Sequence, residues 1–408
     1  MAAETARAFA ALERQAQVLM SAFIAAGHEA VSPAVIQPAR YFLDVIGESL
    51  RARTYVFTDP DGDELCLRPD LTVPACRLHL ERDPAARQPA KYCYNGAAFR
   101  FQPMGGDSTH PREFRQAGIE NFGDAGREAA DAETVALILS SLRAAGLKGE
   151  QLRLGDLGLF RALLKSVAMP ERWRQLLMHR FWRPEAFRAE LKRLVSGTGQ
   201  MLDPKRRAFV ATLDATDRDA AQAQVATYLD GQGIELTGSR SLAEITESLL
   251  WVAADAKAAP LSLATADLIE SYVAIRAPAT KAIEALGAIA ERAGPEMVRA
   301  VGTYQERLKL LAATGVDLRA AEFSAEFGRN LEYYTGFVFE VVLPKLGRAS
   351  PVAGGGRYDR LLKSVGAPRD VPAVGAAVHT ERLLAAINGG SSAAGNNGSS
   401  AAGNGDAA

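Results

Sequence analysis

The chain has 408 residues, with 47 basic against 48 acidic side chains, a net charge of −1 and a hydrophobic content of 48%. This length can bury a large core, either as one large domain with an insertion or as two domains. The charge balance argues against a general nucleic-acid-binding protein, which would carry a basic excess or a basic face.

The first segment, Thr5–Ala26, carries apolar side chains at helical spacing. This periodicity predicts an amphipathic helix that packs on a core. His28 follows just past the predicted end, where a cation suits the helix dipole. We assign His28 no catalytic role.

Short runs of β-forming residues, separated by turn residues, follow between positions 34 and 123. The first predicted strands are Ala34–Gln37, Thr54–Thr58 and Glu64–Leu67. The segment Asp59–Gly62, which reads DPDG, predicts a turn between two of them. We expect an antiparallel β region here, with one longer helix that starts near Leu71.

Helical character then dominates the middle of the chain. A helix is predicted over Ala130–Ala144 and a strand at Leu152–Leu154, and a long helical stretch follows from about residue 159 to residue 313. Its segment Phe181–Arg207 is rich in Arg and Lys. We interpret these charges as the solvated faces of short helices rather than as a nucleic-acid-binding patch.

Strand patterns resume near the end, at Ala321–Pro344, Val352–Arg357 and Val374–Ile387, and the last of these reads as a strand leading into a helix. The sequence therefore predicts an α+β core in two parts, residues 1–158 and 314–388, separated by a mostly helical insertion over 159–313. Residues 389–408 contain only small and polar residues, so we expect a disordered low-complexity tail.

The cysteines and the N-terminus indicate the compartment. Cys66, Cys76 and Cys93 lack C-x-x-C spacing and clustered histidines, so we expect buried reduced thiols rather than a disulfide framework or a zinc site. The N-terminus has no signal-peptide pattern, and no run of 18 or more apolar residues occurs. We expect a cytoplasmic protein without a membrane span, a bound metal or a cofactor.

Two segments of the first half carry residues suited to holding an ammonium group. Asp70 and Thr72 stand two apart at the end of a predicted strand and so face the same way. Gln116 and Glu120 stand four apart on another predicted strand, which also puts both side chains on one face. A carboxylate there can pair with an ammonium or accept from an imidazole N–H. The alternatives are a surface turn and an ordinary β-hairpin.

Two further segments near the end form the most specific signal, GRNLEYYTGFVFE over Gly328–Glu340 and AGGGRYDRLL over Ala353–Leu362. The adjacent Tyr333 and Tyr334 can supply an aromatic wall and hydroxyls for ring nitrogens. The three glycines from Gly354 can let a strand approach a ligand closely. They do not form a phosphate-binding loop, because no Lys-Ser/Thr pair follows them.

Together these segments resemble the motifs of the histidyl-tRNA synthetase family, over almost all of residues 4–387. The resemblance implies a class II aminoacyl-tRNA synthetase-like core, with a mainly antiparallel sheet flanked by helices, that dimerises through its first motif. It also implies an L-histidine site. The residues that match the histidine-binding positions of the family are Asp70, Thr72, Arg100, Gln116, Glu120, Arg329, Tyr333 and Tyr334.

The sequence departs from the synthetase pattern at several points. Gln102 stands where the family has a glutamate that contacts adenine, and His379 stands where it has a glycine beside the nucleotide, so we expect an altered ATP site. Asp70 is one methylene shorter than the family's glutamate. After the third class-defining motif, at Pro372–Leu384, little sequence remains, and we expect no anticodon-binding domain and no tRNA partner.

This combination resembles the regulatory subunits of ATP phosphoribosyltransferase, which are synthetase-like paralogues. The resemblance implies a non-catalytic role in histidine biosynthesis, with a short-form catalytic subunit as partner, a homodimer within a hetero-oligomer, and L-histidine as the feedback effector. One alternative is a histidine-activating enzyme, either a truncated histidyl-tRNA synthetase or a paralogue. Another is a dimeric scaffold with a vestigial histidine pocket.

Overall fold

The computed structural model describes residues 5–43, 48–102, 111–181, 183–197, 204–214, 216–234, 241–327, 333–344 and 350–388. The chain forms two compact units. The first comprises Met1–Phe160, Ile275–Ala288 and Val298–Ala408, and the second comprises Arg161–Ala274 and Ile289–Met297. The predicted insertion, residues 159–313, contains the second unit together with three stretches of the first, residues 159–160, 275–288 and 298–313. The predicted tail, residues 389–408, lies outside the described residues.

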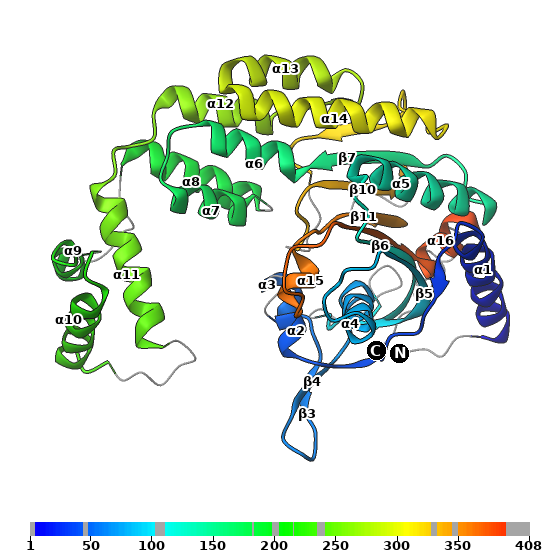
Figure 1. Ribbon diagram of the computed structural model, residues 1–408, viewed down its shortest axis with the longest axis horizontal. Helices are drawn as coiled ribbons and strands as arrows, with labels where there is room; N and C mark the ends of the chain where they lie inside the picture. The colour runs from blue at the N-terminus through cyan, green and yellow to red at the C-terminus, as the bar shows by residue number, and fades with distance from the viewer. Residues whose placement is uncertain are drawn as a thin grey trace, which may run out of the picture. The chain divides into compact units, whose positions relative to one another are not determined.

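The first unit is built on a nine-stranded sheet (Figure 1). Its strands, in spatial order, are β1 (Glu29–Ala30), β5 (Ala90–Phe99), β6 (Glu113–Phe122), β12 (Ala373–His379), β11 (Ala353–Arg357), β10 (Phe337–Val342), β7 (Gln151–Asp156), β9 (Glu322–Ser324) and β8 (Arg276–Pro278). Among the described strand pairs of this sheet, only β1–β5 and β7–β9 are parallel. The prediction of a mainly antiparallel sheet flanked by helices is confirmed.

Helices cover both faces of this sheet. On one face α1 (Ala6–Ala25) packs against β5 and β6 and against α5 (Arg127–Ala144) and α16 (Thr380–Ile387), and Figure 1 shows these three helices grouped together. On the other face α4 (Thr72–Arg82) packs on β5 and β6 through an apolar cluster that includes Leu71, Tyr94 and Phe114. Strand alternation therefore divides the residues of β6 between two different environments.

Local sequence explains where the first helix begins and what it buries. The Thr5 side chain caps α1 by accepting a hydrogen bond from the Ala8 amide. Leu12, Leu19 and Phe23 lie on its buried face. The prediction of an amphipathic helix over Thr5–Ala26 is confirmed.

A small separate sheet contains β2 (Ile36–Pro38), β4 (Glu64–Leu67) and β3 (Val56–Thr58) in that order, and the short helices α2 (Arg40–Leu43) and α3 (Glu48–Arg51) lie between β2 and β3 in the chain. The predicted turn joins β3 to β4, where the Asp59 carboxylate accepts from the Asp61 and Asp63 amides. The three predicted strands of this region are confirmed, with ends shifted by one or two residues.

The second unit is helical in its described part. It contains α7 (Glu171–Arg180), α8 (Pro184–Ser196), α9 (Pro204–Ala211), α10 (Arg218–Gly231), α11 (Leu242–Lys257) and α12 (Leu263–Val273), while α6 (Leu157–Ser166), α13 (Ala282–Ala293) and α14 (Pro295–Ala313) contribute to both units. An apolar cluster that includes Leu213, Val225 and Leu249 holds α9, α10 and α11 together. The short strand β8 interrupts the stretch that the sequence predicts as helical.

The described helices include none that is both long and apolar enough to cross a membrane. The three cysteines are free thiols, and all three are buried.

Candidate functional site

Strand β6 carries Glu120 into the layer between the sheet and α4. Glu120 is 1% exposed, and its carboxylate accepts hydrogen bonds from the Tyr94 hydroxyl at 2.8 Å and from the Tyr358 hydroxyl. Gly375 lies directly across from it on β12, where a Cβ would come within 1.7 Å of Glu120 Oε2. The absence of a side chain at Gly375 therefore makes the space that the carboxylate occupies.

Asp70 reaches the same region from the turn that precedes α4. It is 3% exposed, and its Oδ1 accepts from the Val73 amide at 3.3 Å. Thr72, the first residue of α4, is 8% exposed. The loss of hydration on burial raises the pKa of Asp70, and the nearby Arg100 guanidinium and the Tyr333 hydroxyl act in the opposite direction.

Three tyrosines close around these carboxylates. The ring centroids of Tyr333 and Tyr334 are 4.8 Å apart, and Tyr358 lies 5.7 Å from the first ring and 6.3 Å from the second. We call Asp70, Glu120, Tyr94, Tyr333, Tyr334 and Tyr358 the tyrosine–carboxylate cluster.

Burial controls the ionisation of the cluster. The pKa of Glu120 is raised from 4.5 to about 7, chiefly because burial removes the hydration of its charged form, and the Asp70 charge acts in the same direction. Hydrogen bonds from Tyr358, Thr72 and Tyr94 oppose this shift. Two carboxyl groups in one buried layer favour a ligand that brings positive charge or N–H donors.

Two buried oxygens of the site lack a partner among the described residues. These atoms are Asp70 Oδ2 and Gln116 Oε1. Buried acceptors in folded proteins nearly always have a donor, so both atoms are candidates for contact with a ligand. Gln116 faces the same side of β6 as Glu120 but, four residues along the strand, lies roughly 13 Å from it.

Arg100 lies beside Asp70, but its guanidinium is already engaged. Its Nε donates to the Pro69 carbonyl at 2.9 Å, and its guanidinium carbon lies 4.9 Å from the centre of the Phe114 ring. His379 stacks on the same ring, with centroids 5.1 Å apart. Arg329, the remaining predicted site residue, lies outside the described residues.

Gln102, which stands where the synthetases have a glutamate that contacts adenine, also makes a contact within the chain. Arg53 Nη2 donates to Gln102 Oε1 at 2.5 Å. Gln102 is therefore held by its own chain.

The signature strand β11 connects the cluster to a buried network of charges. Tyr358 points to Glu120, whereas its neighbour Arg357 donates to Asp131 Oδ1 from Nε at 3.0 Å and from Nη2 at 2.7 Å. Arg307 of α14 donates to Asp131 Oδ2 at 2.8 Å. The segment Ala353–Leu362 is thereby tied to α5 and α14.

Tyr94 and Tyr358 belong to the cluster but are not among the site residues predicted from the sequence. Tyr358 lies within the quoted AGGGRYD signature, so its position next to the glycines was an available signal. Tyr94 pairs with Gly118 across β5 and β6, and its hydroxyl occupies the space that a Cβ at Gly118 would need. Such a pairing becomes visible only once the strand register is known.

The chain matches the family model described as histidyl-tRNA synthetase over residues 4–259 and 246–383. It is 36% identical over 371 residues to the ATP phosphoribosyltransferase regulatory subunit of Allorhizobium ampelinum, covering 90% of this chain and 96% of the relative. It is 38% identical to the protein of the same name from Agrobacterium fabrum, covering 90% of this chain and 95% of that protein.

Among solved structures, the chain resembles an ATP phosphoribosyltransferase regulatory subunit/histidyl-tRNA synthetase from Bacillus halodurans. The TM-score is 0.66 at 21% identity, and the alignment covers 95% of this chain and 82% of that one. A histidine–tRNA ligase subunit from Alicyclobacillus acidocaldarius gives a TM-score of 0.57 at 21% identity and covers 95% of this chain and 96% of that one. At this identity both structures support the fold alone.

Proposed function

The chain belongs to the family of ATP phosphoribosyltransferase regulatory subunits, and on that premise we propose that it regulates the first enzyme of histidine biosynthesis without catalysing a reaction. Its partner is a short-form ATP phosphoribosyltransferase catalytic subunit in the cytoplasm. It joins that partner as a homodimer within a hetero-oligomer and conveys feedback by L-histidine. The relatives' shared name, over nearly their whole length, supports this role.

The observation that carries the histidine assignment is the pair of buried carboxylates in the tyrosine–carboxylate cluster, Asp70 and Glu120, of which Asp70 Oδ2 has no partner among the described residues. Asp70 supplies a carboxylate for the α-ammonium group, and Glu120 supplies one for an imidazole N–H. The rings of Tyr333 and Tyr334 offer flat apolar surfaces to the imidazole. Thr72, Arg100, Gln116 and Arg329 complete the proposed site by resemblance to the synthetases.

The regulation is allosteric, which means that histidine binding and the state of the catalytic partner are linked by a coupling free energy. Such couplings are typically about 1–3 kcal/mol. The contacts of Arg357 and Arg307 with Asp131 support a physical route from the cluster to α5 and α14. Binding that moves Tyr358 would act on the adjacent Arg357.

Two internal contacts support the absence of catalysis by this chain. Gln102 accepts from Arg53, and His379 stacks on Phe114 next to Arg100. Both positions would need to be free to bind adenine and phosphate in a synthetase-like site.

A second candidate function, histidine adenylation, draws support from Arg100 and Arg382, which by resemblance match arginines of the second and third class-defining motifs of the synthetases. Arginines beside a nucleotide can stabilise a phosphoryl-bearing transition state. The test is histidine-dependent exchange between ATP and pyrophosphate by the purified chain. We expect no exchange above the rate without histidine, and sustained exchange would replace the regulatory proposal with the enzymatic one.

The regulatory proposal is tested by co-expression with the catalytic subunit from the same organism. We expect the two chains to co-purify and L-histidine to inhibit the complex.

Glu120→Ala should weaken L-histidine binding, measured by calorimetry, by at least about tenfold, since a buried charged partner is lost. Glu113→Ala, an exposed position on the same strand, is the matched control and should bind as the unaltered chain does. Failure to co-purify would contradict the proposal.

A further inference from the structure

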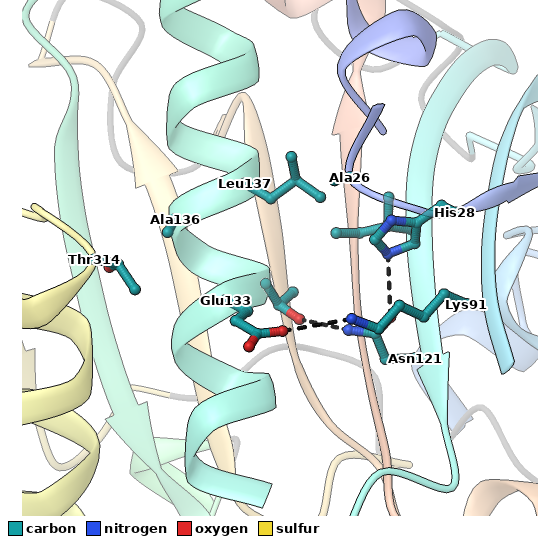
Figure 2. A pocket seen from close by; sticks show the side chains of 10 residues that line it. Ala26, His28, Lys91, Asn121, Glu133, Ala136, Leu137 and Thr314 are labelled. Atoms are coloured by element: carbon teal, nitrogen blue, oxygen red, sulfur yellow. Dashed lines mark hydrogen bonds and ion pairs between the residues drawn. The ribbon is translucent and has the colours of Figure 1, made fainter. Parts of the chain in front are cut away.

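A cavity of about 300 Å³ lies between β6 and α5, on the face of β6 opposite the tyrosine–carboxylate cluster (Figure 2). Ile119 and Asn121 of β6 line one side, and Glu133, Thr134 and Leu137 of α5 line the other. This volume is at the lower end of the range for small-molecule sites. It suits a ligand of about the size of one amino acid.

The inner end of this cavity is polar and already organised. His28 Nε2 lies 3.1 Å from Asn121 Oδ1, and Asn121 Nδ2 donates to Thr134 Oγ1 at 3.4 Å. These three residues are 5%, 4% and 1% exposed, respectively. Both ring nitrogens of His28 already have partners, the Phe23 carbonyl and Asn121 Oδ1, whereas the Asn121 amide and the Thr134 hydroxyl can still donate to a ligand and accept from it.

The outer end of the cavity carries one charge of each sign. Lys91 Nζ and Glu133 Oε2 are 3.5 Å apart, and their side chains are 39% and 57% exposed. In Figure 2, Glu133 on α5 points across to Lys91 and Asn121. An exposed ion pair of this length contributes only about 0–1 kcal/mol, so a ligand can separate its two partners at little cost.

We propose that this cavity binds the zwitterion of a small α-amino acid. The ligand carboxylate pairs with Lys91 and the ligand ammonium pairs with Glu133. Its side chain passes between Ile119 and Leu137 to the polar inner end, where a neutral amide or imidazole finds both donors and acceptors. This site is separate from the proposed histidine site and does not depend on the proposed function.

The two sites share a strand. Asn121 and Glu120 are neighbours on β6, and they point to opposite faces of the sheet. A variant at Glu120 therefore removes the proposed contact of the first site while leaving the lining of this cavity unchanged.

The test uses calorimetry on the full chain carrying Glu120→Ala, with L-glutamine and L-histidine as probes and L-leucine as the apolar comparison. We expect at least one polar probe to bind with one site per chain and more tightly than L-leucine. N-acetyl-L-glutamine, which lacks the ammonium group, should bind at least about tenfold more weakly than L-glutamine.

The decisive variant is Lys91→Met with Glu133→Gln, which removes both charges and should weaken binding of the polar probe by at least about tenfold. Lys309→Met with Glu306→Gln removes another exposed ion pair and is the matched control, so its binding should be unchanged. The same pair of variants in the otherwise unaltered chain repeats the test if Glu120→Ala does not fold.

The proposal is overturned if neither polar probe binds at about 10 mM, or if the Lys91 and Glu133 double variant binds as well as its control. These outcomes leave the proposed regulatory function intact, because that function is tested by Glu120→Ala and by co-purification.

Discussion

Glu120 is a carboxyl group whose ionisation is opposed by the surrounding fold. Its pKa is raised from 4.5 to about 7 by burial, so the folded protein retains a proton that the unfolded chain releases above its own, lower pKa. With respect to this group, the free energy of unfolding is highest at low pH and falls as the pH rises toward 7. The total loss is about 3 kcal/mol.

Glu120→Gln should therefore remove this part of the pH dependence. The unfolding free energy of the variant, measured by urea denaturation at several pH values, should fall less than that of the unaltered chain between about pH 4.5 and 7, by about 3 kcal/mol. Parallel curves for the two chains would contradict the buried ionisation of Glu120.

Gly375 is a second residue on which the cluster depends. A Cβ at this position would lie 1.7 Å from Glu120 Oε2 and 2.7 Å from the Ile119 carbonyl oxygen. Gly375→Ala should lower the unfolding free energy by about 1–3 kcal/mol and weaken L-histidine binding, because the carboxylate must move. Gly302→Ala is the control, since nothing lies near that Cβ in α14, and it should stabilise the chain by up to about 1 kcal/mol.

At the scale of elements, the buried carboxylate of Asp131 joins α5 to β11 and α14. It is fully buried and accepts from Arg357 and Arg307. Asp131→Asn removes the charge between two buried guanidinium groups and should lower the unfolding free energy by about 3–5 kcal/mol. The measurement is urea denaturation followed by circular dichroism.

The control for this prediction is Asp267→Asn, at an ion pair with Arg292 in which the Asp267 side chain is 69% exposed. Its effect should stay within about 0.5 kcal/mol, because exposed ion pairs contribute little. Equal effects of the two substitutions would show that the network of Asp131 does not hold these elements together.

The sequence predicted those elements whose signal is local. Helix α1 has a capping threonine and a regular apolar face, and β4 is bounded by a strong turn, so both lie where expected. Strands β1 and β8, with two and three residues, were not predicted. Their pairing is determined by neighbouring strands that are distant in sequence, which a single sequence does not reveal.

The same distinction between local signals and tertiary packing applies to the candidate site. The resemblance to the synthetase motifs led to Asp70, Glu120, Tyr333 and Tyr334, which lie close together in the described structure. The hydrogen bonds from Tyr94 and Tyr358 depend on strand register and on the space left by glycines of facing strands. Those features arise from tertiary packing and are not contained in any one motif.

At the scale of the whole molecule, the three tryptophans offer a way to observe the two units separately. Trp173, Trp182 and Trp251 all belong to Arg161–Ala274, the main segment of the second unit. Tryptophan fluorescence therefore reports on that unit, whereas strand content measured by circular dichroism reports mainly on the first. Units with separate cores can unfold in separate transitions.

A matched pair of core substitutions tests this separation. Leu213 lies in the apolar cluster of α9, α10 and α11. Leu213→Ala should lower the unfolding free energy obtained from tryptophan fluorescence by about 2–5 kcal/mol and leave that obtained from the strand signal unchanged. Leu154→Ala, at a fully buried position of β7, should lower the unfolding free energy obtained from the strand signal and leave that obtained from fluorescence unchanged. If both substitutions shift both signals equally, the chain unfolds as one cooperative body.

L-histidine provides a second test of the same separation. If the chain unfolds as one body, the ligand should stabilise both transitions alike, whereas separate units predict that only the strand signal responds to the ligand.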